Sequence, residues 1–143
     1  MYSESIQDIY QPHHKNALSS ENQHPVSSGF PSPADNYTEQ TLDLNQQLIR
    51  HPSSSFLMRV QGDSMDNAGI HDGDLLVVDR AIQPEPGKVV IAAINGDLTV
   101  KRLTLYQGQF WLTPENPRYR PVPLNEFNDS FVWGVVVHVI HSL

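Results

Sequence analysis

The stretch "VVIAAINGDLTVKRLTL", residues 89–105, gives the clearest indication of the fold. Two runs rich in β-branched residues flank Asn95 and Gly96, and an Asn-Gly pair in this setting is the strongest short signal for a two-residue hairpin turn. We therefore expect two adjacent antiparallel strands, in which successive side chains point to opposite faces of the sheet.

Further short strands are expected on both sides of this hairpin. Upstream, "SFLMRV" (55–60) alternates and "LLVVD" (75–79) follows a turn, while downstream come "QFWLT" (109–113), a proline-rich loop and "FVWGVVVHVI" (131–140). The spacing leaves almost no room for helices between strands. The predicted fold class is mainly β, a strongly bent or barrel-like antiparallel β-domain.

The N-terminal part of the chain has a different composition. Residues 1–40 are dominated by Ser, Asn, Gln, His and Pro and have no sustained period of 2 or 3.6, which is typical of a mobile arm. One short helix is predicted where Leu44, Leu48 and Ile49 fall at helical spacing before Pro52. We expect a flexible arm over residues 1–40 and a β-rich domain over residues 41–143.

Composition limits the classes of function. The chain of 143 residues has a formal net charge of −7, from 9 basic and 16 acidic residues, which argues against binding nucleic acid by neutralising phosphates. Any contact with DNA is therefore expected to be indirect. The chain has no cysteine, no apolar run long enough to span a membrane and no secretory signal pattern. These features predict a cytoplasmic protein without membrane contact.

Metal and cofactor sites are not expected. The aspartates at 66, 72, 74 and 79 do not match the spacing of a calcium-binding EF-hand loop, and the histidines show no metal-site spacing.

The segment "QGDSM" places Ser64 in a Gly-Asp turn, where a serine nucleophile would need a base. The nucleophile elbow G-x-S-x-G fails because position 66 is Asp, and no aspartate has the downstream histidine of GDSL-type lipases. Lys101 shares a strand face with Thr99 and could act as the base if burial kept its amine neutral. A solvated Lys101 remains the ordinary alternative for a lysine in a strand, and strand pattern does not choose between them.

Several ordered segments then carry a resemblance. "GDSM" (62–65), "GIHDGDLLVVD" (69–79), "LTVKRL" (98–103), "LTPEN" (112–116) and "WGVVVHVI" (133–140) resemble the UmuD proteins of the LexA-like self-cleaving serine peptidase family. The similarity extends over roughly residues 29–140. It implies that Ser64 is the nucleophile and Lys101 the general base, 37 residues further along the chain.

The resemblance also implies a substrate within the same chain. Members of this family cut themselves between a small residue and a glycine, and the matching bond is Ser28-Gly29 in "HPVSSGFPSPADNY". UmuD proteins often have Cys, and LexA proteins Ala, where this chain has Ser28. Since all three residues are small, we expect the bond to be cleavable. The alternative is that this segment is only a flexible linker, which would have a similar composition.

Partners follow from the resemblance as well. It implies cleavage stimulated by a RecA filament on single-stranded DNA, after which a homodimer of residues 29–143 would act with UmuC in an error-prone translesion DNA polymerase of the SOS response. Only 28 residues precede Gly29, without a helix-turn-helix pattern, so repression of transcription is not expected. A non-cleaving interaction module of the same fold, and a Ser/Lys peptidase acting on other proteins, are the alternatives.

Overall fold

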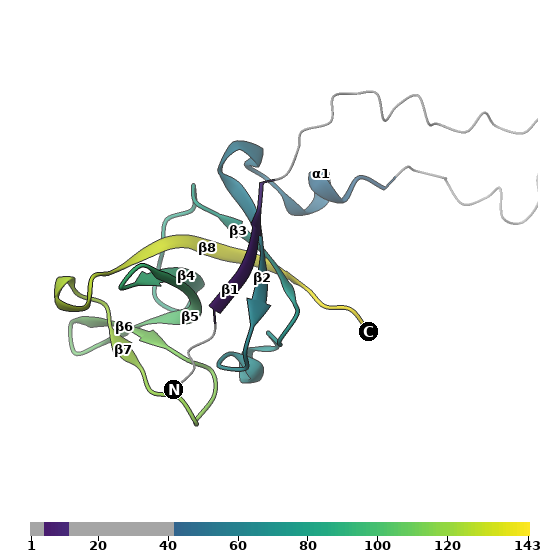
Figure 1. The fold of residues 1–143 in the computed structure, drawn as a ribbon. Coiled ribbons are helices and arrows are strands. Elements are labelled where there is room, and N and C mark those ends of the chain that lie inside the picture. The colour runs from purple at the N-terminus through teal and green to yellow at the C-terminus, as the bar shows by residue number, and fades with distance from the viewer. Residues whose placement is uncertain (1–4, 12–41) are drawn as a thin grey trace, which may run out of the picture.

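The computed structural model describes residues 5–11 and 42–143, and these form one strongly curved antiparallel sheet of eight strands (Figure 1). The strand order in space is β1-β2-β3-β8-β4-β5-β6-β7. The strands are β1 (Ser5–Tyr10), β2 (Ser55–Gln61), β3 (Leu75–Asp79), β4 (Val89–Ile94), β5 (Asp97–Tyr106), β6 (Gln109–Thr113), β7 (Val122–Pro123) and β8 (Ser130–Ile140). The predicted mainly β, barrel-like fold class is confirmed.

Helices are short in the described part of the chain. The helix α1 spans Leu44–Leu48, and the Asp43 side chain caps it by accepting a hydrogen bond from the Asn45 N–H. Single turns of 3-10 helix occupy Pro52–Ser54, Asp66–Ala68 and Glu126–Asn128. None of the described helices is long and apolar enough to cross a membrane.

The hairpin at Asn95-Gly96 joins β4 to β5 as predicted. Both turn residues adopt positive φ angles, 51° at Asn95 and 87° at Gly96, which two-residue hairpin turns of this kind require. The hairpin places Lys101 of β5 opposite Val90 of β4.

The long strand β8 lies in the middle of the sheet, between β3 and β4 (Figure 1). Register shifts interrupt both of its pairings, between Val77 and Val78 on β3 and between Ile91 and Ala92 on β4. Such bulges increase the local twist of a sheet. They accompany its curvature, and β1 at the first edge comes into contact with β5.

Apolar side chains pack on both faces of the sheet. One cluster contains Met58, Val60, Met65, Ile70, Leu76, Val78, Ile91 and Val100, and the other contains Val90, Ala92, Leu103, Leu112 and Val135. Neighbouring residues of β4 alternate between the two clusters, which explains why its central residues are all buried.

The strand β1 is not among the strands predicted from the sequence. Residues Ser5–Tyr10 fall within the predicted arm over residues 1–40, and they pair with β2 along its outer edge. Sequence periodicity did not indicate this strand because an edge strand needs few apolar anchors. Ile6 of β1 packs against the core. The division of the chain at residue 40 stays a prediction.

Candidate active site

The turn that carries Ser64 leaves the end of β2 and leads into the 3-10 helix Asp66–Ala68. Its backbone is fixed locally, because the Gly62 N–H donates to Asp72 Oδ1 (2.8 Å) and the Asp66 N–H donates to the Asp63 carbonyl (3.2 Å). Ser64 itself has no exposed surface.

Lys101 reaches this turn from the middle of β5. Its side chain points inward and is 5% exposed. Its Nζ lies 3.0 Å from Ser64 Oγ, 2.7 Å from Thr99 Oγ1 and 3.0 Å from the Val100 carbonyl oxygen. The structure therefore brings together the two residues that the sequence suggested as nucleophile and base.

These contacts suit proton transfer between Ser64 and Lys101. An ammonium group can donate to all three oxygens. A neutral amine can keep donating to Thr99 and Val100 while its lone pair accepts the Ser64 hydroxyl hydrogen. The same geometry thus accommodates the lysine before and after it takes the serine proton.

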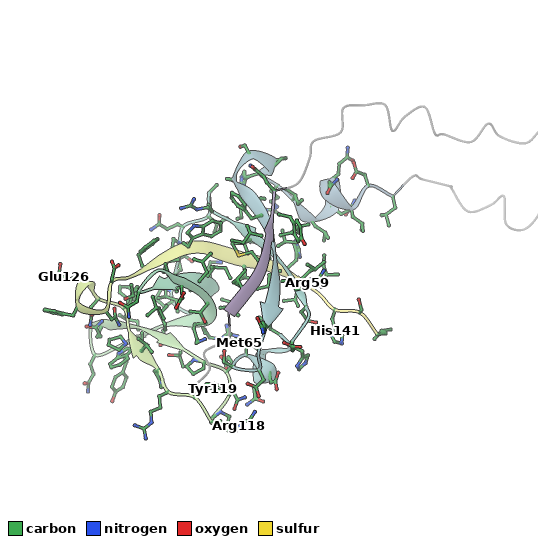
Figure 2. The ribbon with its side chains drawn as sticks, viewed as in Figure 1. Arg59, Met65, Arg118, Tyr119, Glu126 and His141 are labelled. Atoms are coloured by element: carbon green, nitrogen blue, oxygen red, sulfur yellow. The ribbon has the colours of Figure 1, made fainter. Side chains whose placement is uncertain are left out.

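A distant loop holds the Ser64 turn in place. The Asn116 side chain donates to the Asp63 carbonyl (2.9 Å), and the Asp63 carboxylate accepts from both Arg118 and Tyr119. In Figure 2, Arg118 and Tyr119 lie close together at the lower end of the molecule, and Met65 lies above them, nearer its middle. Asp63, which the sequence allowed as a turn residue or a catalytic one, has its carboxylate engaged by this loop.

Buried carboxylates stabilise both ends of β3, the neighbour of β2. Asp74 accepts from the His71 N–H (2.8 Å) and lies 2.6 Å from His141 Nδ1. Asp79 accepts from His51, Ser54 and the Ala81 N–H. Burial acts to raise the pKa of the Asp79 carboxyl, but the hydrogen bonds from His51, Ala81 and Ser54 outweigh it and lower that pKa.

Two features of this site were not predicted from the sequence. Thr99 was placed on the same strand face as Lys101, two residues before it, but its hydrogen bond with the Lys101 amine was not predicted. The contacts of Asp63 with Arg118 and Tyr119 had no local signal, because they join residues more than fifty positions apart.

The predicted cleavage-site residues Ser28 and Gly29 lie outside the described residues. Among those that are described, no group of three or more His, Cys, Asp or Glu side chains is arranged to hold a metal ion.

Comparison with known proteins gives the family. The model of the family described as "Peptidase S24-like" matches residues 13–137. The chain belongs to the peptidase S24-like family. Its membership confirms the resemblance to UmuD and LexA proteins, and the chain is a UmuD-like member of a family of self-cleaving serine peptidases.

Individual relatives of this S24-like chain cover most of its length. Protein ImpA of Shigella flexneri is 49% identical over 117 residues, which are 80% of this chain and 77% of the relative. Protein MucA of Escherichia coli is 44% identical over 114 residues, 79% of this chain and 77% of the relative. The LexA repressor of Acidithiobacillus ferrooxidans is 40% identical over 118 residues, 80% of this chain but 57% of that repressor.

Proposed function

We propose that Ser64 and Lys101 form a catalytic dyad that cuts the chain's own Ser28-Gly29 bond. The observation that carries the proposal is the 3.0 Å contact between Lys101 Nζ and the buried Ser64 Oγ. A buried amine that is neutral can act as the general base for a serine, which removes the need for a histidine.

The reaction follows from this pair. Neutral Lys101 takes the proton of the Ser64 hydroxyl as Oγ attacks the carbonyl carbon of Ser28. The bond between that carbon and the Gly29 nitrogen then breaks, and the Lys101 ammonium returns the proton to the leaving amine. Water hydrolyses the resulting Ser64 ester, with Lys101 again as base, and leaves a carboxylate on Ser28. Backbone N–H groups of the turn around Asp63, Ser64 and Met65 are the candidates for stabilising the oxyanion.

The wider role rests on the family. We infer that the chain is a cytoplasmic protein of the SOS response, in which a RecA filament on single-stranded DNA stimulates this single-turnover cleavage. Residues 29–143 would then act as a homodimer with UmuC in translesion synthesis. The UmuD-like relatives and the S24-like family support this assignment.

The test is the intact mass of the purified protein after incubation at pH 7, near pH 10, and at pH 7 with RecA, single-stranded DNA and a nucleotide. Raising the pH deprotonates a lysine, so cleavage is expected at alkaline pH even without RecA. The expected products are fragments 1–28 and 29–143.

Variants assign the residues. Ser64→Ala and Lys101→Ala should give no fragments under any condition. Ser53→Ala and Lys88→Ala are matched controls at exposed positions and should cleave like the unaltered chain. If the unaltered chain stays intact throughout, the β-domain is a binding module and the dyad assignment is wrong.

A further inference from the structure

The segment "LTPEN", residues 112–116, spans the end of β6 and the start of the loop that follows it. The register between β5 and β6 places Thr113 opposite Arg102, the residue that directly follows Lys101. Alternate residues of an extended chain lie on the same side, so Glu115 continues on the side of Thr113 and comes within reach of Arg102. The strand pairing therefore brings this loop to the strand that carries the candidate base.

An ion pair joins the loop to β5. Arg102 Nε donates to Glu115 Oε1 at 2.5 Å, and the two side chains are 31% and 32% exposed. Arg102 Nη1 also donates to the Gly87 carbonyl at 2.5 Å, which fixes the guanidinium on a second side. Because both charges are partly buried, water and salt screen this pair less than a fully exposed one. Glu115 is thus anchored to the residue next to Lys101.

The same loop holds the Ser64 turn on both sides of the serine. The Glu115 carbonyl accepts a hydrogen bond from the Asn67 N–H (2.9 Å), three residues after Ser64. The Asn116 side chain donates to the carbonyl of Asp63 (2.9 Å), the residue directly before Ser64. Glu115 therefore contacts β5 through its carboxylate and the Ser64 turn through its backbone.

The rest of the loop is braced against itself and against Asp63. The Asn116 side chain accepts from the Arg118 N–H (3.0 Å), and the Asn116 carbonyl accepts from the Tyr119 N–H (3.1 Å). The side chains of Arg118 and Tyr119 both donate to the Asp63 carboxylate. These contacts make the loop a connection that can hold the turn in a fixed place relative to β5.

Strand pairing alone does not set the distance between the two candidate catalytic residues. In the sheet, β3, β8 and β4 lie between β2, which leads into the Ser64 turn, and β5, which carries Lys101. A change of curvature in these intervening strands would move Ser64 relative to Lys101. Displacements of about 1 Å between reacting groups can slow a reaction roughly a hundredfold. A direct connection between the turn and β5 restricts such displacements.

We propose that residues 115–119 form a positioning clamp, in which Glu115 ties the Ser64 turn to β5 and keeps Ser64 Oγ at its 3.0 Å contact with Lys101 Nζ. The inference rests on the proposed function, since it names what positions the two groups of that site. Glu115 is a positioning residue, because it acts through Asn67 and Arg102 and not on the reacting atoms.

Removing the Glu115 carboxylate tests the clamp. Glu115→Ala should slow self-cleavage of the full-length chain near pH 10 by about tenfold, as expected for loss of one charge-assisted hydrogen bond. Intact mass against time measures the rate, and circular dichroism checks that the chain is folded at the assay temperature. Glu85→Ala removes a carboxylate at an exposed position and should cleave like the unaltered chain. A Glu115→Ala chain as fast as the unaltered chain would overturn the proposal.

Two further comparisons separate positioning from a general loss of stability. Glu115→Gln keeps an oxygen that can accept from Arg102, so it should cleave at least about threefold faster than Glu115→Ala. Arg102→Ala should slow cleavage as well, and adding Glu115→Ala to it should cost less than about a further twofold, because both changes remove the same contact. Losses that multiply in the double variant, or equal rates for Glu115→Gln and Glu115→Ala, would contradict the clamp.

A second variant covers the case in which Glu115→Ala does not fold. Asn116→Asp keeps the size of the side chain but replaces the donor to the Asp63 carbonyl by an acceptor. It should slow cleavage by about fivefold or more, and an unchanged rate would count against the clamp.

Amide hydrogen exchange separates this inference from the proposed function. In full-length chains that carry Ser64→Ala, NMR follows the Asn67 amide, whose hydrogen bond to the Glu115 carbonyl joins the turn to the loop. Adding Glu115→Ala should speed its exchange by about fivefold or more, because the loop is no longer tied to β5. The Asn95 amide, which donates to the Asp129 carbonyl, is the control and should exchange at an unchanged rate.

The cleavage and exchange measurements together give distinct outcomes. Faster exchange at Asn67 without cleavage in any chain that keeps Ser64 would support the clamp and reject the dyad. Cleavage of the unaltered chain, together with unchanged exchange at Asn67, would reject the clamp and leave the dyad in place.

Discussion

Thr99 contacts the candidate dyad through Lys101, and its role can be tested by substitution. Its Oγ1 lies 2.7 Å from Lys101 Nζ and its side chain is 3% exposed. We interpret Thr99 as a positioning residue, which holds the amine within reach of Ser64.

Thr99→Val should slow self-cleavage near pH 10 without abolishing it. The substitution removes one hydrogen bond, worth about 1 kcal/mol, which corresponds to a roughly five- to tenfold decrease in rate. Intact mass against time measures it. Thr99→Ser keeps the hydroxyl and should restore most of the rate, and a Thr99→Val chain as fast as the unaltered one would exclude positioning.

The lowered pKa of the Asp79 carboxyl predicts that the stability of the fold depends on pH. Its folded-state pKa lies below the usual value of 3.8, so its stabilising contribution is complete above that value and is lost as pH falls through the lowered folded pKa. Asp79→Asn should therefore be less stable than the unaltered chain at pH 7, and the difference should shrink as the pH falls below 3.8. Urea unfolding at several pH values measures it. Asp97→Asn, which removes a carboxylate at an exposed position, is the matched control.

At the scale of single elements, β8 depends on a glycine. An added Cβ at Gly134 would lie 2.7 Å from Val78 Cγ1, closer than side chains approach one another. The central strand can pack against β3 at this point only because position 134 has no side chain.

Gly134→Ala should destabilise the fold by about 1–3 kcal/mol, the usual cost of overpacking a core. In a Val78→Ala background the added methyl group has room, so the cost should be smaller. Thermal or urea unfolding of the unaltered chain, the two single variants and the double variant gives the free energies of unfolding for a double-mutant cycle. Additive costs would mean that the contact with Val78 is not the cause.

The elements themselves follow closely from the sequence where local signals are strong. The segments predicted at 75–79, 89–94 and 109–113 coincide with β3, β4 and β6, since turn residues mark their ends. The two-residue β7 and the bulges of β8 escaped prediction because they depend on partners far away in the chain. The contacts of the candidate site show the same contrast. The strand pattern places Thr99 and Lys101 on one face, whereas the contact between Tyr119 and Asp63 forms only when the chain folds.

At the scale of the whole molecule, the fold depends little on its first strand. Among the described residues, both core clusters are built from residues that follow position 49, and Ile6 packs against one of them. The proposed product, residues 29–143, would therefore retain seven of the eight described strands.

The shortened chain 29–143 should unfold cooperatively. Loss of the partly buried Ile6 costs about 1–2 kcal/mol, which corresponds to a decrease in Tm of roughly 4–8 °C. Scanning calorimetry of the intact and shortened chains measures the difference. A broad transition or a much larger decrease would show that the N-terminal residues belong to the folding unit.

The complete burial of Ser64 has a consequence for how such a protein is detected. Reagents that label serine hydrolases react with hydroxyl groups that they can approach from solvent, and Ser64 offers no exposed surface despite its contact with Lys101. A fluorophosphonate survey of a cell extract would therefore pass over the intact chain. It would find this serine only in molecules in which the Ser64 hydroxyl had become accessible to solvent.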